Sequence, residues 1–181
     1  SELIINNRGA IYHLNLRPEE LASTIITVGD PDRVKEVSKH FDKVEFELRH
    51  RELVTHTGYV GKKRISVVAT GIGPDNIDIV FNELDALANI DFSTRTVKPT
   101  LKSLNIIRIG TSGAVQEDIP VGSIMVSEYG IGLDSLMQYY LHQLSGDEHM
   151  ILDAIKSHFH HFKGISPYIT AADPDLIETI G

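Results

Sequence analysis

Two arginines lie where a protein could use them to bind an anion. Arg108 interrupts the apolar run 104–109, and Arg33 follows closely after the apolar run 23–28. A guanidinium stays charged in proteins and offers donors in a fork that fits carboxylate or phosphate oxygens. A buried strand would leave Arg108 in need of an anionic partner. That partner is either a ligand or, as the structural alternative, one of the chain's many acids.

The sequence after the first apolar run predicts a capped helix that carries Arg33. Asp30 suits the N-cap and Pro31 the first helical position, so we expect a helix from Pro31 to His40. Arg33 then lies in the first turn, near N–H groups that already favour an anion. The alternative is a surface ion pair of Arg33 with Glu36 or Asp32.

Three predicted strands end in turns that contain glycine: TVGDPDR, VATGIGPDN and IRIGTSGA. If these strands are parallel neighbours, the turns meet at one edge and form a pocket for a small tetrahedral oxyanion. Thr111 and Ser112 would add hydroxyl donors there. Gly71 and Gly73 are similar to the start of a dinucleotide fingerprint, but Asn76 stands in place of the third glycine and there is no P-loop lysine.

The elements that would position these residues alternate between strands and helices, which predicts an α/β fold. The central sheet should be mixed and largely parallel, because an antiparallel hairpin over 44–59 leads into a central strand at 64–70. The helix opened by Pro74 has an apolar stripe with the i, i+3, i+4 spacing of a buried face. Further expected segments are an exposed excursion at 91–103, a strand at 123–127, a glycine-rich loop at 129–134, helices at 136–144 and 149–162, a strand at 165–172 and a helix from 173.

The composition is that of a globular protein, with 181 residues, 41% hydrophobic residues and a formal charge of -8. We expect a single domain over 1–181. The negative charge argues against nucleic acid and anionic membranes as partners, since both require a basic face. No cysteine, signal peptide or long apolar run is present, so we expect a cytoplasmic protein.

The three motifs together, in their order and spacing, resemble the hexameric nucleoside phosphorylase family, particularly its uridine phosphorylases. The motifs are Gly29–Val34, Thr70–Gly73 and Arg108–Ala114. The resemblance implies a three-layer fold with a central sheet and flanking helices. It also implies phosphorolysis, in which inorganic phosphate attacks the anomeric carbon of a nucleoside and gives ribose 1-phosphate and the free base.

The resemblance implies a role for each matching residue. Arg33 and Arg108 would be the catalytic pair that holds and orients phosphate. The residues expected to contact phosphate are Gly29, Arg33, Arg51, Arg108 and Thr111. Those expected to contact the ribose and the rest of the nucleoside are His13, Thr111, Ser112 and Gly113.

Two of these contacts would cross a subunit interface. In the family, the residues that match Arg51 and His13 reach the phosphate and the sugar 5′-hydroxyl of a neighbouring subunit, so we expect a homo-oligomer built from dimers, up to a hexamer. The glutamate that matches Glu52 helps some members bind a monovalent cation such as potassium at this interface. No other cofactor is expected, because phosphate is a substrate.

The sequence departs from the family in two places. The excursion at 91–103 is longer than in the shorter enterobacterial type. The family's base-recognition segment and its Met-Glu motif for the ribose 2′- and 3′-hydroxyls would lie beyond residue 181, so the chain is expected to be incomplete at its C-terminus. A purine nucleoside phosphorylase and a non-catalytic phosphate-binding fragment therefore stay open as alternatives, whereas a nucleosidase that uses water would have no use for two arginines around phosphate.

Overall fold

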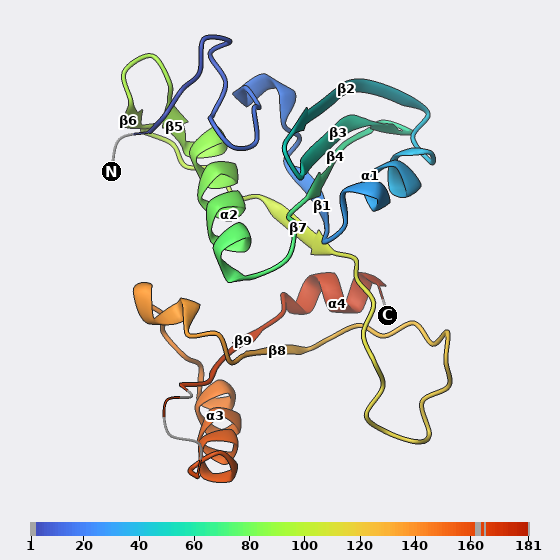
Figure 1. The fold of residues 1–181 in the computed structure, drawn as a ribbon, viewed down its shortest axis with the longest axis vertical. Coiled ribbons are helices and arrows are strands. Elements are labelled where there is room, and N and C mark those ends of the chain that lie inside the picture. The colour runs from blue at the N-terminus through green and yellow to red at the C-terminus, as the bar shows by residue number, and fades with distance from the viewer. Residues whose placement is uncertain (1–2, 162–163, 165, 181) are drawn as a thin grey trace. The chain divides into compact units, whose positions relative to one another are not determined.

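A computed structural model describes residues 3–161, 164 and 166–180 (Figure 1). The chain divides into two compact units, residues 1–112 and 113–181, which we describe separately. The single-domain expectation for 1–181 stays a prediction. No helix in the described residues has both the length and the apolar character needed to cross a membrane.

A five-stranded mixed sheet forms the centre of the first unit, in the order β2-β3-β4-β1-β7. The central strand β1 runs parallel to β4 and β7, and β2 and β3 are antiparallel additions at one side. The strands comprise β1 (Thr24–Val28), β2 (Lys43–His50), β3 (Leu53–Val60), β4 (Lys63–Ala69) and β7 (Asn105–Arg108). This arrangement confirms the predicted α/β fold with a mixed sheet.

Helices α1 (Pro31–Ser38) and α2 (Pro74–Asn89) cover opposite faces of this sheet. Alternate residues of a strand point to opposite faces. Val28 and Val67 pack in one apolar cluster with Val34 of α1, whereas Ile25 and Val68 pack in another that includes Val80, Leu84 and Leu87 of α2. The first unit therefore has a helix, sheet and helix in three layers.

The helix start signals act as predicted, although α1 is shorter than expected. The Asp30 Oδ1 atom accepts a hydrogen bond from the Asp32 N–H at 2.9 Å, and Pro31 opens the helix. Helix α1 ends at Ser38 rather than at His40. In α2, the predicted stripe buries Val80, Leu84 and Leu87, and each such side chain contributes about 2 kcal/mol by leaving water.

The strand that carries Arg108 differs from the expectation of a strand buried on both faces. Among the described residues β7 pairs only with β1, so it is an edge strand. Ile106 and Ile107 are half-buried and Arg108 is exposed. In the chain before β7, the predicted excursion contains a small hairpin of β5 (Ile90–Asp91) and β6 (Thr96–Val97). A 3-10 turn (Pro18–Glu20) precedes β1.

In its described residues, the second unit contains a two-stranded sheet and three helical segments. Strand β8 (Tyr129–Gly132) pairs antiparallel with β9 (Tyr168–Ala171). The helical segments are a 3-10 turn (Leu136–Tyr139), α3 (Gly146–His158) and α4 (Pro174–Ile180). The Glu148 carboxylate joins α3 to β9 by accepting hydrogen bonds from the N–H groups of Ser145 at 2.7 Å and Ala171 at 2.8 Å.

Several expectations for this unit were wrong. The strand expected at 123–127 is irregular, and the glycine-rich loop expected at 129–134 contains β8 instead. The helix expected at 136–144 is only a 3-10 turn over Leu136–Tyr139, and the chain becomes extended at Tyr140. The helix expected to reach Phe162 ends at His158, and Phe162 and Ile165 lie outside the described residues.

Candidate functional site

The carboxyl ends of three parallel strands meet at one edge of the five-stranded sheet. Backbone hydrogen bonds continue past the ends of the strands, from Thr70 N–H to the Val28 carbonyl at 2.8 Å and from Ile109 N–H to the Thr27 carbonyl at 2.9 Å. The turns that follow β1, β4 and β7 therefore start side by side. This is the edge at which open α/β sheets bind ligands.

Gly29 brings the end of β1 against the side chain of Arg108. A Cβ atom added at Gly29 would meet Arg108 Nη2 at 3.3 Å and the Gly71 carbonyl oxygen at 3.8 Å. Any side chain here would press on the guanidinium. Gly29 therefore lies between the ends of β4 and β7, with the arginine close to its backbone.

Arg33 reaches the same place from the other layer. Its Nη2 donates a long hydrogen bond of 3.5 Å to Thr111 Oγ1 in the turn after β7. The Asp30 cap and the bond from Arg33 N–H to the Asp30 carbonyl at 3.1 Å fix the first turn of α1, and with it the start of the arginine side chain. The structure thus brings Gly29, Arg33, Arg108 and Thr111 together.

Neither arginine forms the ion pair that the structural alternative requires. In the described part of the chain, no carboxylate oxygen lies within 4.0 Å of Arg33 or Arg108. Glu36 pairs with Lys39 instead, at 2.5 Å. Two exposed guanidinium groups without carboxylates can take a dianion with charge-assisted hydrogen bonds.

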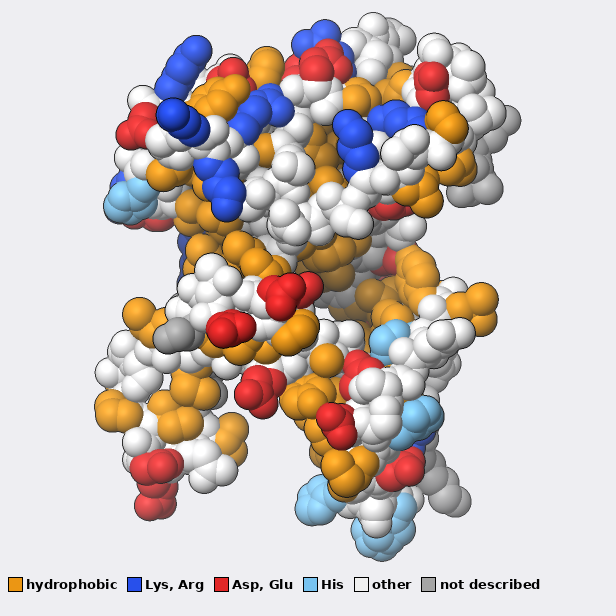
Figure 2. Space-filling view, turned by 180° about the vertical axis from the view of Figure 1, so that it is seen from behind, with side chains coloured by type: hydrophobic (Ala, Val, Ile, Leu, Met, Phe, Trp, Pro, Cys, Tyr) orange, Lys and Arg blue, Asp and Glu red, His pale blue; other side chains and the backbone are white. Residues whose placement is uncertain are grey.

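The first unit, which carries this edge of the sheet, has no net charge, although the whole chain is acidic. Residues 1–112 contain 15 Lys and Arg and 15 Asp and Glu, whereas residues 113–181 contain two and ten. The whole net charge of -8 therefore belongs to the second unit. On the face drawn in Figure 2, the basic side chains lie mostly over the first unit.

The turn after β4 requires glycine for reasons of space and backbone conformation. Gly71 has a φ of +69°, and a Cβ atom there would lie 2.4 Å from Asn76 Nδ2. Asn76 Nδ2 also donates to the Ile72 carbonyl at 3.4 Å. The asparagine thus supports this turn from the first turn of α2.

A second cluster joins the N-terminal segment to the turn between β2 and β3. Rings of Tyr12 and His13 meet edge to face at 4.9 Å, and Tyr12 and His50 at 5.8 Å. His50 Nδ1 lies 3.0 Å from the His13 carbonyl, and the Arg51 guanidinium lies 5.9 Å from the Tyr12 ring centre. His13 and Arg51, both expected to serve a neighbouring subunit, thus belong to one group.

The turn that carries Arg51 lies at the carboxyl edge of the sheet but away from β1. His50 pairs with Leu53, so Arg51 and Glu52 form a two-residue loop. Because β3 is separated from β1 by β4, this loop lies about 10 Å from β1 at ordinary strand spacing. Arg51 has a φ of +56°, which favours glycine, asparagine or aspartate.

The other expected site residues are exposed. Ser112 ends the first unit, Gly113 begins the second, and Glu52 lies in the turn after Arg51. Within the described residues, three or more His, Asp or Glu side chains gather nowhere as they would around a metal ion. A cation at Glu52 would need ligands from elsewhere, and we derive no step through it.

Sequence reasoning missed Glu83, which holds the loop of His13. Its carboxylate accepts hydrogen bonds from the N–H groups of His13 at 3.0 Å and Leu14 at 2.8 Å, and lies 2.7 Å from His13 Nδ1. The signal was present in the spacing: Glu83 follows Val80 by three residues and precedes Leu84, so it lies on the apolar stripe of α2.

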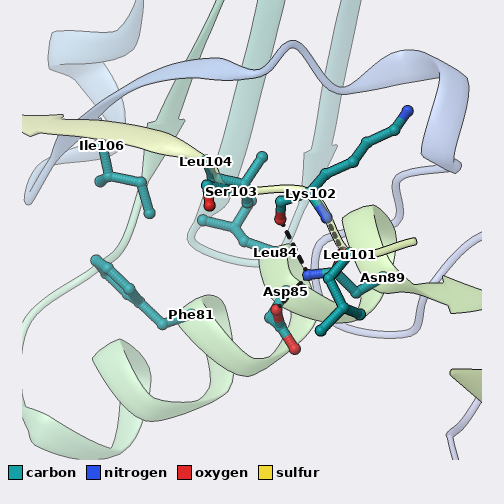
Figure 3. A pocket seen from close by; sticks show the side chains of 9 residues that line it. All are labelled: Phe81, Leu84, Asp85, Asn89, Leu101, Lys102, Ser103, Leu104 and Ile106. Atoms are coloured by element: carbon teal, nitrogen blue, oxygen red, sulfur yellow. Dashed lines mark hydrogen bonds between the residues drawn. The ribbon is translucent and has the colours of Figure 1, made fainter. Parts of the chain in front are cut away.

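A groove of about 460 Å³ lies elsewhere, between α2 and the edge strand β7 (Figure 3). Its polar wall is already paired: Asn89 bonds to Asp85 Oδ1 at 2.7 Å and, through Nδ2 and Oδ1, to the Lys102 backbone at 3.2 and 2.7 Å. Lys102 is the only basic residue that lines this groove among the described residues, so the groove lacks the pair of arginines that distinguishes the strand-end site.

The family model described as "Phosphorylase superfamily" matches residues 23–180. A uridine phosphorylase of Thermococcus kodakarensis is 31% identical over 133 residues, which are 74% of this chain and 43% of that protein. A DeoD-type purine nucleoside phosphorylase of Alkaliphilus metalliredigens is 34% identical over 116 residues, which are 64% of this chain and 44% of that protein.

A solved structure has a similar fold. The crystal structure of a Trypanosoma brucei nucleoside phosphorylase, described as showing uridine phosphorylase activity, matches with a TM-score of 0.88 and 30% identity. The match covers 99% of this chain and 60% of that one. The chain spans about half the length of the curated relatives it matches.

Proposed function

This chain belongs to the phosphorylase superfamily over residues 23–180, and on that premise we propose that its strand-end site binds inorganic phosphate for the phosphorolysis of a nucleoside, preferably uridine. The observation that carries the proposal is the meeting of Arg33 and Arg108 beside Gly29 and Thr111, with no carboxylate partner among the described residues.

The proposed reaction is the transfer of a pentosyl group to phosphate. A phosphate oxygen forms a bond to the anomeric carbon while the bond from that carbon to the base nitrogen breaks. The base leaves with the electron pair and takes up a proton, so the products are ribose 1-phosphate and the free base. Thr111 and Ser112 are donors in this scheme and form no covalent bond.

The two arginines contribute orientation and charge. Holding the phosphate dianion in one place converts an encounter in solution into a reaction within a complex. The same dianion places negative charge beside a sugar that becomes cationic as the base leaves, which stabilises the transition state. Fixed donors at the sheet edge need no rearrangement when this charge develops.

The contacts across a subunit interface belong to the same proposal. His13 and Arg51 would reach the nucleoside and phosphate of a neighbouring copy, in a homo-oligomer built from dimers. Their grouping with Tyr12 and His50 supports this, because one surface then presents both side chains. A monovalent cation near Glu52 and a cytoplasmic location complete the proposal.

A purine nucleoside is the second candidate substrate. The DeoD-type relative, 34% identical over 116 residues, favours it. Uridine phosphorylases and this relative match the chain at similar identity. Uridine and inosine are therefore compared in the same experiment.

The deciding experiment measures base release from uridine and from inosine, with and without inorganic phosphate. The 181-residue chain is assayed beside a version extended to the end of its reading frame. We expect phosphate-dependent release of uracil by the extended version, and Arg108→Ala should lower the rate at least a hundredfold. Release of base without phosphate, or none from either nucleoside in the extended version, would overturn the proposal.

Phosphate binding by the 181-residue chain separates catalysis from binding. Calorimetric titration should show phosphate binding that Arg108→Ala and Arg33→Ala each weaken. Arg95→Ala is the matched control, because Arg95 lies in the β5–β6 loop and bonds to the Leu3 carbonyl. Binding without turnover in either version would support the alternative of a non-catalytic phosphate-binding protein.

A further inference from the structure

Glu83 is a largely buried carboxylate that devotes both oxygens to the loop of His13. Its side chain is 12% exposed. Oε1 faces the His13 N–H at 3.0 Å and the His13 Nδ1 at 2.7 Å, and Oε2 accepts from the Leu14 N–H at 2.8 Å. Three donors thus converge on one carboxylate from α2.

These contacts select one form of the His13 ring. A carboxylate can only accept hydrogen bonds, so the Nδ1 atom must carry the proton at 2.7 Å. In the neutral imidazole the other nitrogen, Nε2, is then an acceptor. Within the described part of the chain Nε2 has no hydrogen-bond partner, and the side chain is 33% exposed.

The ring and its backbone are held from other sides as well. Tyr12 packs edge to face against the ring at 4.9 Å, and His50 Nδ1 lies 3.0 Å from the His13 carbonyl. Leu14, the next residue, is buried in the core. His13 therefore presents Nε2 from a fixed position.

We propose that Glu83 is the positioning residue for the ribose 5′-hydroxyl: it holds His13 with Nδ1 protonated, so that Nε2 accepts the hydrogen bond of the 5′-hydroxyl group. This rests on the proposed function, which places His13 at the nucleoside of a neighbouring copy. Glu83 touches no substrate itself. Its effect should be confined to substrates that carry a 5′-hydroxyl group.

The first test needs no substrate. Nitrogen-15 NMR of histidine-labelled protein at pH 8, with His13 assigned from His13→Gln, reports which ring nitrogen carries the proton. We expect the Nδ1-protonated form of His13, and a shift toward the Nε2-protonated form in Glu83→Gln, whose amide can donate to Nδ1. A predominantly Nε2-protonated His13 in the unchanged protein would overturn the proposal.

The second test compares uridine with 5′-deoxyuridine in the extended, full-length protein. Glu83→Gln should lower kcat/KM for uridine about tenfold, the size of one hydrogen bond, mainly through KM. For 5′-deoxyuridine the change should stay within about twofold, because there is no hydroxyl for Nε2 to bind. An equal loss with both substrates would show a structural role and overturn the proposal.

Three further variants separate a shared contact from independent effects. His13→Ala should reproduce the pattern of Glu83→Gln, and the double variant should be no worse than His13→Ala alone, because both act through one contact. Glu47→Gln is the matched control, since Glu47 is an exposed glutamate on β2, with a side chain that is 66% exposed. Additive losses in the double variant would contradict the proposal.

The failure of the proposed function would look different. A protein that cleaves no nucleoside with phosphate would overturn phosphorolysis and, with it, the role at the 5′-hydroxyl. The NMR measurement would still decide whether Glu83 fixes the ring of His13.

Discussion

The guanidinium of Arg108 lies against the backbone of Gly29, so that a Cβ atom added there would meet Nη2 at 3.3 Å. This contact joins the end of β7 to the end of β1. The guanidinium can keep this position only if residue 29 is glycine.

Gly29→Ala should displace Arg108 by a few tenths of an ångström and weaken phosphate binding about fivefold, since a hydrogen bond to a charged group depends on its geometry. Thermal unfolding should change little, because Gly29 is not among the described glycines with positive φ. Calorimetric titration with phosphate measures the effect. Gly146→Ala is the control, because a Cβ atom at Gly146 meets no atom within 4 Å; equal affinities in both variants would contradict the prediction.

Arg51 should show opposite effects on stability and on phosphate affinity. Its φ of +56° is unfavourable for a residue with a side chain, so Arg51→Gly should leave the free energy of unfolding unchanged or raise it by up to about 1 kcal/mol. Arg51→Ala should not gain this stability. Urea denaturation of both variants gives the comparison.

Both Arg51 variants should lose phosphate affinity if the arginine serves a neighbouring subunit. Binding is measured at protein concentrations above and below the dissociation of the oligomer. An unchanged affinity in Arg51→Ala would remove this residue from the phosphate site.

Glu20 should be the most important carboxylate for the stability of the N-terminal segment. Its side chain is 2% exposed and accepts from Arg8 at 2.8 and 2.7 Å and from Arg17 at 3.1 and 2.9 Å. Glu20→Gln leaves Arg8 without its anion and leaves Arg17 only its exposed pair with Glu19 at 3.1 Å, and should lower the free energy of unfolding by about 3 kcal/mol. Glu19→Gln, at an exposed position, should cost less than about 0.5 kcal/mol.

The Glu20 network also predicts a loss of stability in acid. Burial of the carboxyl raises its pKa, but the hydrogen bonds from Arg8 and Arg17 outweigh this and hold the pKa of Glu20 below its usual value. Its contribution is complete above the unfolded pKa of about 4.3 and is lost as the pH falls through the lower folded value. A stability profile of Glu20→Gln that kept this acid slope would contradict the prediction.

His56 should make the first unit less stable below neutral pH. Burial lowers the pKa of His56, the Glu47 carboxylate opposes this in part, and Lys35 adds to the lowering. The unfolded chain therefore binds more protons below about pH 6.5, and the free energy of unfolding falls until the folded pKa is passed. Unfolding in urea at pH 5 to 8 measures the slope.

A substitution of His56 should remove that slope. Ser38 at the end of α1 lies 2.7 Å from His56 Nδ1, so His56→Gln retains a polar partner for the hydroxyl. His40→Gln, at an exposed position just after α1, is the control and should retain the slope. A slope retained in His56→Gln would assign it to another group.

Local patterns predicted the elements around the strand ends and failed where pairing partners decide the structure. The Asp30 cap and the stripe of α2 are set by neighbouring residues, and the structure confirms both. Strand β7 has an apolar sequence typical of a central strand, but its position in the sheet depends on which strands lie beside it. Its place at the edge, and the exposure of Arg108, could not be read from the run 104–109.

Strand β8 also could not be predicted from local sequence, because its structure depends on its pairing partner β9. Gly130 and Gly132 indicate a loop by local preference, yet β8 forms because β9 pairs with it. A Cβ atom at Gly132 would lie 1.9 Å from Tyr168 Cζ, so the glycine permits the tyrosine to cross the strand. Glu83 was missed similarly, because His13 is 70 residues away in sequence.

The sheet order has a consequence for the way the phosphate edge is assembled. Strands β2, β3 and β4 are joined by two tight hairpins and can pair early, since their contacts close short loops. Pairing of β1 joins Thr24 to Ile65 of β4 and to Asn105 of β7, and both pairings close much longer loops than the hairpins do. We expect Gly29 and Arg108 to meet in the last and slowest step of folding, so that a newly made chain gains its two-arginine edge only when the sheet is complete.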